Sequence, residues 1–512
     1  DLLVYRQTVI FAQKKVSRNR NKPLYENITI SDLGAEGKSL AKVGEKVVFT
    51  DHAVPGDVVD LQVTVCRRRY EEARVVRYHR YSAVRAEPFC DHFGLCGGCK
   101  WQNLPYEKQL FYKQKQVEDQ LRRIGKLELP PLMPILGSSD TLFYRNKLEF
   151  SFSNNRWLSR EEMEDPRAAS DRDALGFHVP GMFDKVFRVE KCWLQPEPSN
   201  AIRNFIFHFA REEGYAFYDI RGGEGFLRSL IIRNSTEGEV MVILSFFRDQ
   251  REERERVLNA LRERFPEITS LMYVINNKGN DTITDREVCL YSGKDHITEN
   301  MEGLRFRIGP KSFFQTNSRQ ALELYRKVRE FSSLKGDETV YDLYSGTGTI
   351  SLFLARHCKK VIGLEYVKEA TEDAWSNARF NGINNASFYT GDIKTFLKAG
   401  FPEQEGSPEV VITDPPRSGM HEDVVMAIAG ALPARIVYVS CNPATQARDM
   451  ALLDPYYRVE KIQPLDMFPH THHVENIALL VRRVDPRDQR QEPPEAENRL
   501  LHPFRSFPPS RH

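Results

Sequence analysis

The chain has 512 residues, of which 41% are hydrophobic and 28% are charged, a composition typical of a folded protein with several domains. The formal net charge is only +2, which excludes a chain that is basic over its whole surface, so any nucleic-acid surface must be local. No run of about 18 apolar residues predicts a membrane span. The first ten residues lack the features of a secretory signal, and eight cysteines in so long a chain do not indicate a disulfide framework. We therefore expect a cytoplasmic protein.

The first part of the chain predicts a flexible lead followed by a small β-barrel. Residues 1–23 are polar and basic, with little to bury. Residues 24–85 contain short strand-like runs separated by glycines, the pattern of an OB-like barrel. The runs 32–37 and 54–57 resemble the TRAM domain, a barrel appended to RNA-modifying enzymes, and this resemblance implies RNA binding. The alternative is a barrel that only packs against its neighbours.

The middle of the chain, residues 86–300, predicts a mixed α/β domain. A helix is expected from about residue 106 to residue 124, and the charged stretch 155–175 is expected to be an exposed insertion. Four further runs predict strands: 148–153, 229–234, 239–247 and 271–276.

Residues 301–483 alternate strand and helix, which predicts a doubly wound parallel sheet of the Rossmann-like type. Residues 484–512 are rich in Pro, Arg and Glu, and we expect them to be disordered. The predicted fold class is thus α/β: a Rossmann-like domain preceded by an N-terminal barrel and a central α/β domain.

A cofactor site is predicted at the first strands of the Rossmann-like domain. Gly346 and Gly348 form a Gly-x-Gly turn between a strand and a helix, where the backbone can approach a ligand closely. A dinucleotide site would have a third glycine where Ser351 stands, which argues against NAD. The next strand ends in Glu365, which can bind both ribose hydroxyls, and Asp392 follows a third strand, where it can bind an adenine amino group. The series resembles the class I S-adenosylmethionine methyltransferases.

Later strand ends carry residues suited to methylating C5 of a uracil. This carbon is too weak a nucleophile to attack a sulfonium methyl group unaided, but a thiolate added to C6 creates an enolate and enriches C5 in electrons. A base must then remove the C5 proton. We assign Cys441 as the nucleophile and Glu475 as the base, with Asp414 near the cofactor or the base, and Arg417 stabilising negative charge. A lone cysteine is more often structural; Cys441 is favoured because it follows an apolar strand at the ligand-binding edge.

Four motifs in this part resemble the RNA uracil-C5 methyltransferases: 311–317, 414–417, 440–443 and 473–476. The resemblance implies that Gln315, Tyr344, Glu365 and Asp414 contact S-adenosylmethionine, together with the turn at Gly346. Two expected contacts depart from residues common in the family: Thr349 stands where Asn is frequent, and Asp392 where some members have Asn. The histidines His470, His472 and His473 show no metal-binding spacing, and we expect hydrogen-bonding or packing roles for them.

A cysteine cluster at the start of the central domain predicts a metal site. Cys90, Cys96 and Cys99 follow the spacing Cys-x5-Cys-x2-Cys among glycines, and Cys192 is the best fourth ligand. Four thiolates fit zinc or an iron–sulfur cluster, and spacing alone does not choose between them. The pattern resembles the large-subunit rRNA branch of the family, which implies a [4Fe-4S] cluster.

The resemblance implies a monomer that methylates a uracil of 23S rRNA. One alternative keeps the chemistry and changes the substrate to another rRNA uracil or a tRNA. A non-catalytic RNA-binding protein is disfavoured by intact Cys441 and Glu475. A cytosine-C5 DNA methyltransferase would have proline where Ser440 stands, and an amino-methyltransferase would have an aromatic residue where Arg417 stands.

Overall fold

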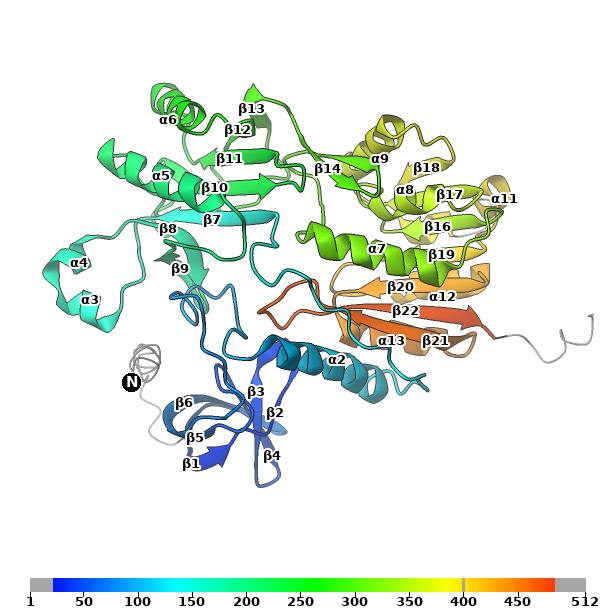
Figure 1. Cartoon of the computed structure of the whole chain (residues 1–512), viewed down its shortest axis with the longest axis horizontal. Coiled ribbons are helices and arrows are strands. Elements are labelled where there is room, and N and C mark those ends of the chain that lie inside the picture. The colour runs from blue at the N-terminus through cyan, green and yellow to red at the C-terminus, as the bar shows by residue number, and fades with distance from the viewer. Residues whose placement is uncertain (1–21, 398–400, 484–512) are drawn as a thin grey trace, which may run out of the picture.

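The computed structural model describes residues 22–397 and 401–483. Nearly all of the predicted flexible lead, residues 1–23, and the whole predicted disordered tail, residues 484–512, lie outside this described part. In the described part of the chain, three large sheets each occupy their own region of the molecule, and a fourth sheet has only two strands (Figure 1). Among the described residues, no helix combines the length and the apolar character needed to cross a membrane.

The N-terminal unit is a six-stranded, mostly antiparallel sheet with the order β1-β5-β6-β4-β3-β2. Its core is small and aliphatic, because alternate residues such as Val59, Leu61 and Val63 of one strand point inward and are buried. Its elements are β1 (Leu24–Thr29), β2 (Asp32–Leu33), η1 (Ala35–Gly37), β3 (Ser39–Val43), β4 (Lys46–Thr50), β5 (Val58–Cys66) and β6 (Tyr70–Arg80).

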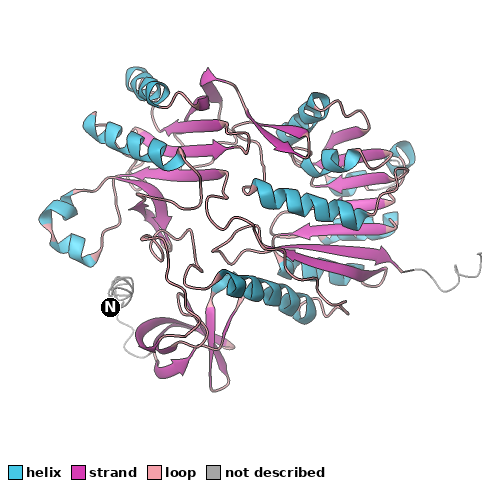
Figure 2. Cartoon of the chain, in the orientation of Figure 1, coloured by secondary structure: helices cyan, strands magenta, loops and turns pink. Residues whose placement is uncertain are grey.

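The central unit is built on a seven-stranded sheet with the order β13-β12-β11-β10-β7-β8-β9, followed by the hairpin β14-β15. Strands β10 and β11 are buried along their whole length, although β10 includes the polar residues Arg228, Ser229, Arg233 and Asn234. The segment expected to be an exposed insertion contains two short helices, which project from the edge of the molecule (Figure 2). The elements are β7 (Lys147–Ser153), α3 (Arg160–Glu164), α4 (Pro166–Ser170), β8 (Ala174–Val179), β9 (Met182–Arg188), α5 (Ser199–Glu212), β10 (Leu227–Asn234), β11 (Val240–Phe246), α6 (Arg251–Arg264), β12 (Ile268–Ile275), β13 (Val288–Gly293), β14 (Ile297–Met301) and β15 (Leu304–Ile308).

The C-terminal unit is a seven-stranded sheet with the order β18-β17-β16-β19-β20-β22-β21, parallel except at β22. The strand order reverses between β16 and β19, and ligands bind beside such a switch point at the carboxyl ends of the strands. The elements are α7 (Ser318–Ser332), β16 (Thr339–Leu343), α8 (Thr349–Ala355), β17 (Lys360–Glu365), α9 (Lys368–Phe380), β18 (Ala386–Thr390), α10 (Ile393–Phe396), α11 (Phe401–Glu405), β19 (Val410–Thr413), α12 (Glu422–Ala431), β20 (Arg435–Ser440), α13 (Pro443–Leu453), β21 (Tyr457–Leu465) and β22 (Glu475–Arg482).

Helices cover both faces of this last sheet, as the predicted class requires. Val340 of β16 packs in the core shared with α7, α8 and α9, whereas its neighbour Tyr341 packs in the core on the opposite face with α12 and α13. The predicted α/β fold class, with an N-terminal β-sheet unit, a central α/β unit and a Rossmann-like domain, is confirmed.

The predicted helix near residues 106–124 is α2 (Tyr106–Arg123). Although it lies in the central part of the sequence, its buried residues Val117 and Leu121 belong to the core of the C-terminal sheet. It packs on α13 and β21. The helix therefore joins the cysteine-rich segment before it to the far edge of the Rossmann-like domain.

Candidate active site

The predicted cofactor turn is held by a carboxylate from the next strand. Tyr344, Gly346 and Gly348 all have positive φ, and a Cβ added at Gly348 would lie 2.9 Å from the Cβ of Ala374, so the turn tolerates no side chain there. The Glu365 carboxylate accepts hydrogen bonds from the main-chain N–H of Gly346 at 2.9 Å and of Val367 at 2.8 Å. Each oxygen keeps a lone pair, so this carboxylate can still bind a ribose.

The other expected cofactor residues lie around this turn or just beyond it. The segment holding Gln315 runs beside it, since the Thr347 hydroxyl donates to the carbonyl of Phe313 at 3.3 Å. The hydroxyl of Thr349, at the start of α8, accepts a hydrogen bond from the hydroxyl of Tyr325 at 3.1 Å. Asp392 is exposed and caps α10.

Two exposed aromatic residues near the turn were not predicted as site residues. Phe313 is 68% exposed and Tyr366, directly after Glu365, is 76% exposed. Aromatic side chains left uncovered beside a ligand turn offer stacking surfaces for an adenine or a base. Their position in the sequence could have indicated them, because Phe313 lies two residues before the predicted cofactor contact Gln315 and Tyr366 lies one residue after Glu365.

The register of two strands brings the predicted nucleophile and base together. Ser440, the last residue of β20, lies opposite Asn476 in the antiparallel pair β20–β22. Continuing this register by one residue places Cys441 opposite Glu475, and directly opposed side chains have Cβ atoms about 4.5–5.5 Å apart. The Glu475 carboxyl accordingly contributes to a raised pKa of the Cys441 thiol.

Burial gives the three acidic groups of this site unusual proton affinities. Burial, and then the neighbouring Asp342, raises the pKa of Asp414 to about 7, while burial and Asp414 raise the pKa of Glu475 well above its ordinary value. Burial, Glu475 and Asp414 together raise the pKa of Cys441 to about 12, and Arg417 opposes them. In the free protein these shifts therefore favour the protonated forms of the Cys441 thiol and of the Glu475 carboxyl.

Cys441 opens into a cavity of about 480 Å³ that also contains the predicted metal ligands. Histidines form another part of its lining, and burial lowers the pKa of His472 to about 3 and of His473 to about 4, so both imidazoles are neutral. The lining residues include Cys90, Cys96, Cys99, Cys192, Arg145, Arg417, Cys441, His472 and His473. One cavity thus joins two sites that the sequence predicts separately.

The four predicted ligands are free thiols that face one another across this cavity. Cys99 interacts electrostatically with Cys96, Cys192 and Cys90, and burial raises its pKa to about 12. Within the described residues, no three His, Cys, Asp or Glu side chains are arranged closely enough to hold a single metal ion. The four thiols are of the chemical type that binds zinc or an iron–sulfur cluster.

A second cavity, of about 390 Å³, continues from the cysteine segment toward the N-terminal sheet. The two cavities share Gly97, Cys99 and Lys100, while Lys38 and Arg74 of the N-terminal sheet and Trp157 of the central unit line the second. Basic and aromatic side chains along one groove are the usual means of binding phosphates and unstacked bases.

The chain is similar to known RNA methyltransferases. The family described as tRNA (Uracil-5-)-methyltransferase matches residues 233–483, and the TRAM domain matches residues 25–76. An uncharacterized RNA methyltransferase of Bacteroides thetaiotaomicron is 58% identical over 454 residues, covering 88% of this chain and 100% of its own. Another, of Porphyromonas gingivalis, is 55% identical over 463 residues, covering 89% and 100%.

A solved structure resembles nearly the whole molecule. The tRNA (uracil-54, C5)-methyltransferase of Pyrococcus abyssi, in complex with S-adenosyl-L-homocysteine, superposes with a TM-score of 0.69 at 28% identity, covering 88% of this chain and 99% of its own. Fold and site define an S-adenosylmethionine-dependent class I methyltransferase that acts on RNA. More specifically, the chain belongs to the RNA uracil-C5 methyltransferase family and carries the TRAM domain at its N-terminal side.

Proposed function

We propose that this enzyme methylates C5 of a uracil in 23S rRNA through a covalent bond between Cys441 and C6, giving 5-methyluridine. The observation that carries the mechanism is the strand register that sets Cys441 opposite Glu475, with Asp414 interacting with both. A nucleophile and a base that lie side by side at the ends of neighbouring strands are what addition to C6 followed by elimination at C5 requires.

The reaction proceeds in three balanced steps. The sulfur of Cys441 adds to C6 of the uracil, and the electrons of the C5=C6 bond move toward C5 and the O4 enolate. S-adenosylmethionine, when bound, supplies the methyl group that C5 takes up as the carbon–sulfonium bond breaks. Glu475 then removes the C5 proton, the C5=C6 bond re-forms, and Cys441 leaves as a thiolate.

Activation of Cys441 depends on its surroundings. With its pKa raised to about 12, the thiol must release its proton to solvent through the cavity before it adds to C6, and Arg417 is the nearby group that favours the thiolate. Glu475 must likewise be in its carboxylate form when it removes the C5 proton. The same guanidinium can stabilise the enolate that develops on the base. A uracil stacked in a folded RNA must be extruded to reach this cavity.

We further propose that Cys90, Cys96, Cys99 and Cys192 hold a [4Fe-4S] cluster. Each thiolate of such a cluster binds a different iron, so the sulfurs stand farther apart than the four ligands of one zinc ion. Four free cysteines that line one cavity supply the number and type of ligands that such a cluster takes. Stoichiometric zinc in the purified protein would overturn this assignment.

The rRNA target is supported by the cysteine cluster and the TRAM domain occurring together in one chain. The second candidate is tRNA, because the Pyrococcus abyssi protein of similar fold is a tRNA methyltransferase. Both candidates use the same chemistry and the same site, so only the RNA distinguishes them.

The test uses 5-fluorouracil-substituted RNA with S-adenosylmethionine. Fluorine leaves no C5 proton for Glu475 to remove, so the covalent complex accumulates and migrates as a shifted band in a denaturing gel. We expect the band with 23S rRNA fragments, its loss in Cys441→Ala, and its retention in Cys66→Ala, which changes an exposed cysteine. A band with tRNA alone would overturn the rRNA assignment, and no band with any RNA would overturn the covalent mechanism.

A further inference from the structure

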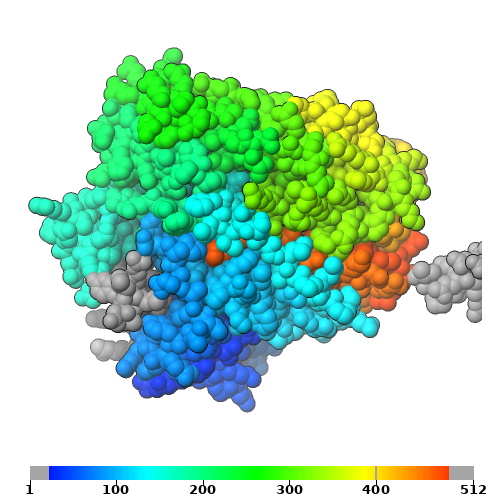
Figure 3. Space-filling view, in the orientation of Figure 1, coloured from blue at the N-terminus to red at the C-terminus, as the bar shows by residue number. Residues whose placement is uncertain are grey.

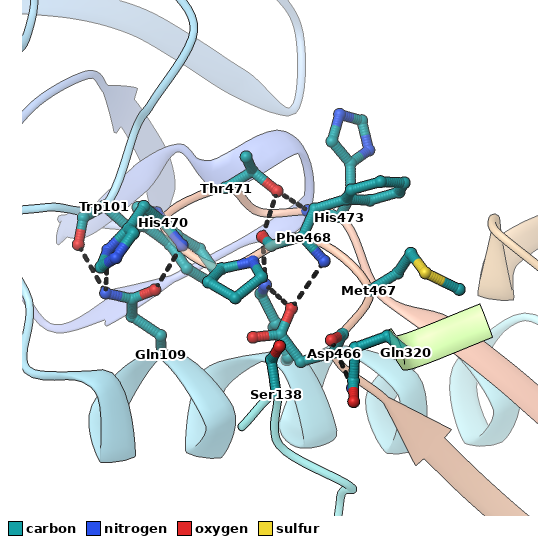
Figure 4. Close-up of polar contacts among 12 residues, drawn as sticks. Trp101, Gln109, Ser138, Gln320, Asp466, Met467, Phe468, His470, Thr471 and His473 are labelled. Carbon is teal, nitrogen blue, oxygen red and sulfur yellow. Dashed lines mark hydrogen bonds and ion pairs between the residues drawn. The ribbon is translucent and has the colours of Figure 1, made fainter. Parts of the chain in front are cut away.

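The loop 466–474 connects β21 to β22 and ends at the predicted base, Glu475. A fully buried ion pair anchors its first residue: Lys113 of α2 donates to Oδ1 of Asp466 at 2.5 Å, and both side chains have 0% exposure. The same ammonium donates to the carbonyl of Phe468 at 3.0 Å, and the N–H of Phe468 donates to Asp466 at 3.0 Å (Figure 4).

Two more side chains of α2 hold the same loop. The Tyr106 hydroxyl donates to the second carboxylate oxygen of Asp466 at 2.8 Å. The Gln109 amide accepts from the main-chain N–H of His470 at 2.8 Å and its nitrogen lies 3.2 Å from Nδ1 of that ring (Figure 4). Three consecutive turns of one helix face therefore contact one loop.

The opposite side of the loop contacts the start of α7. The Gln320 amide donates to the carbonyl of Asp466 at 2.8 Å, and the Asn317 amide donates to the carbonyl of Met467 at 3.0 Å. In the space-filling view, orange atoms of the C-terminal part of the chain show between cyan and green segments (Figure 3). The loop is thus restrained from both sides.

The anchored residue lies next to the cross-strand partner of the base. Leu465 is paired with Glu475 in the antiparallel register of β21 and β22, and Asp466 follows Leu465 directly. The connection therefore runs from Lys113 to Asp466, through the neighbouring pair Leu465–Glu475 to the base. The base in turn interacts electrostatically with Cys441. A displacement of Asp466 would be transmitted to the base by the strand register.

Stability alone does not explain this ion pair. Burial lowers the pKa of Lys113, and the attraction of Asp466 opposes that effect. A buried pair of this kind is often no more stabilising than apolar residues of similar volume, but it specifies one geometry because each charge requires its partner. Val117 and Leu121, on the same face of α2, already supply apolar attachment.

We propose that Lys113 and Asp466, assisted by Gln109, are positioning residues that hold Glu475 where it removes the C5 proton. This inference rests on the proposed function, in which Glu475 is the base. It makes a specific prediction about which step fails: addition of Cys441 and methyl transfer proceed, whereas elimination slows, so methylated RNA remains bound to the enzyme.

The test compares covalent enzyme–RNA complexes formed on unmodified RNA with S-adenosylmethionine. We expect Lys113→Met to accumulate the complex as Glu475→Gln does, and to lower kcat by about ten- to hundred-fold while KM for S-adenosylmethionine changes by less than about two-fold. The single variant leaves the Asp466 carboxylate buried without its partner, so it could fail to fold. The double variant Lys113→Met/Asp466→Asn is therefore measured as well, because it removes both charges and keeps a hydrogen-bond acceptor at position 466. Leu121→Ala, a buried truncation on the same helix, serves as the control for lost stability.

Each outcome is decisive. The inference is supported if the covalent complex accumulates in Lys113→Met or in the double variant but not in Leu121→Ala, when the Tm of the proteins compared has fallen by the same amount. Equal accumulation in Leu121→Ala, or folded variants that release product normally, would overturn it, as would failure of the double variant to fold. If Glu475→Gln itself accumulates no complex while the wild type methylates RNA, the assignment of Glu475 in the proposed function is wrong instead.

Discussion

The side-chain amide of Asn442 donates a hydrogen bond to the main-chain carbonyl of Arg417 at 3.0 Å. Asn442 also caps α13, so the turn that carries Cys441 is joined both to the helix after it and to the turn after β19. The contact joins the main chain of Arg417 to the turn that carries Cys441, and the Arg417 guanidinium lowers the pKa of that thiol against the effect of burial.

Replacing Arg417 should therefore reduce the reactivity of Cys441. In Arg417→Gln we expect alkylation of Cys441 by iodoacetamide at pH 8 to slow by about ten-fold, since one pKa unit changes the thiolate fraction ten-fold. Peptide mass spectrometry follows Cys441 and the exposed Cys66 in the same sample, and Cys66 should be unaffected. Equal rates at Cys441 in both proteins would show that Arg417 does not influence the thiol.

The buried carboxyl of Asp342 should make the protein less stable as the pH rises. Burial raises its pKa to about 7, so the folded state binds more protons than the unfolded state between pH 4 and 7. The resulting stability is complete below the unfolded pKa and is lost as the pH passes about 7. We expect Asp342→Asn to flatten this decline by on the order of 1–3 kcal/mol in denaturant unfolding between pH 5 and 8.

The exposed substitution Glu369→Gln serves as the control for that experiment, because it removes a carboxyl group from the surface of α9. It should leave the pH dependence unchanged. An Asp342→Asn protein with the wild-type slope would mean that this carboxyl does not titrate in the folded state as proposed.

Glu365 should contribute directly to cofactor affinity. We expect Glu365→Ala to weaken binding of S-adenosylhomocysteine by about ten- to hundred-fold in calorimetry, because two charge-assisted hydrogen bonds to the ribose are lost. Glu365→Gln keeps an acceptor for the N–H of Gly346 and should be intermediate. Full affinity in Glu365→Ala would exclude a ribose contact.

Cys192 should be required for the proposed iron–sulfur cluster even though it lies far from the other three ligands in sequence. After anaerobic purification we expect stoichiometric iron and sulfide in the wild type and a loss of most of both in Cys192→Ser. Cys66→Ser, at the exposed end of β5, should retain them. Unchanged iron and sulfide in Cys192→Ser would remove this residue from the ligand set.

Local patterns were sufficient to predict the fold class and the location of the candidate site. Apolar runs that alternate with helical segments predicted the parallel sheet. Glu365, Asp414 and Cys441 lie at one edge of it, because each is at or just after the end of a strand and parallel strands end on the same side. The exposed aromatic residues Phe313 and Tyr366 were not predicted, because exposure beside a turn depends on what fails to cover it.

The sequence by itself thus determined the chemistry: which residue types follow which strands, and the family to which their order belongs. Only the tertiary structure decided how they meet. The antiparallel register of β22 sets Glu475 opposite Cys441, and Lys113 reaches Asp466 across 353 positions of the chain. The periodicity of apolar residues in a sequence shows only which face of one segment is buried. Strand register and buried charge pairs depend on how segments distant in sequence pack together, and a local sequence pattern does not contain that information.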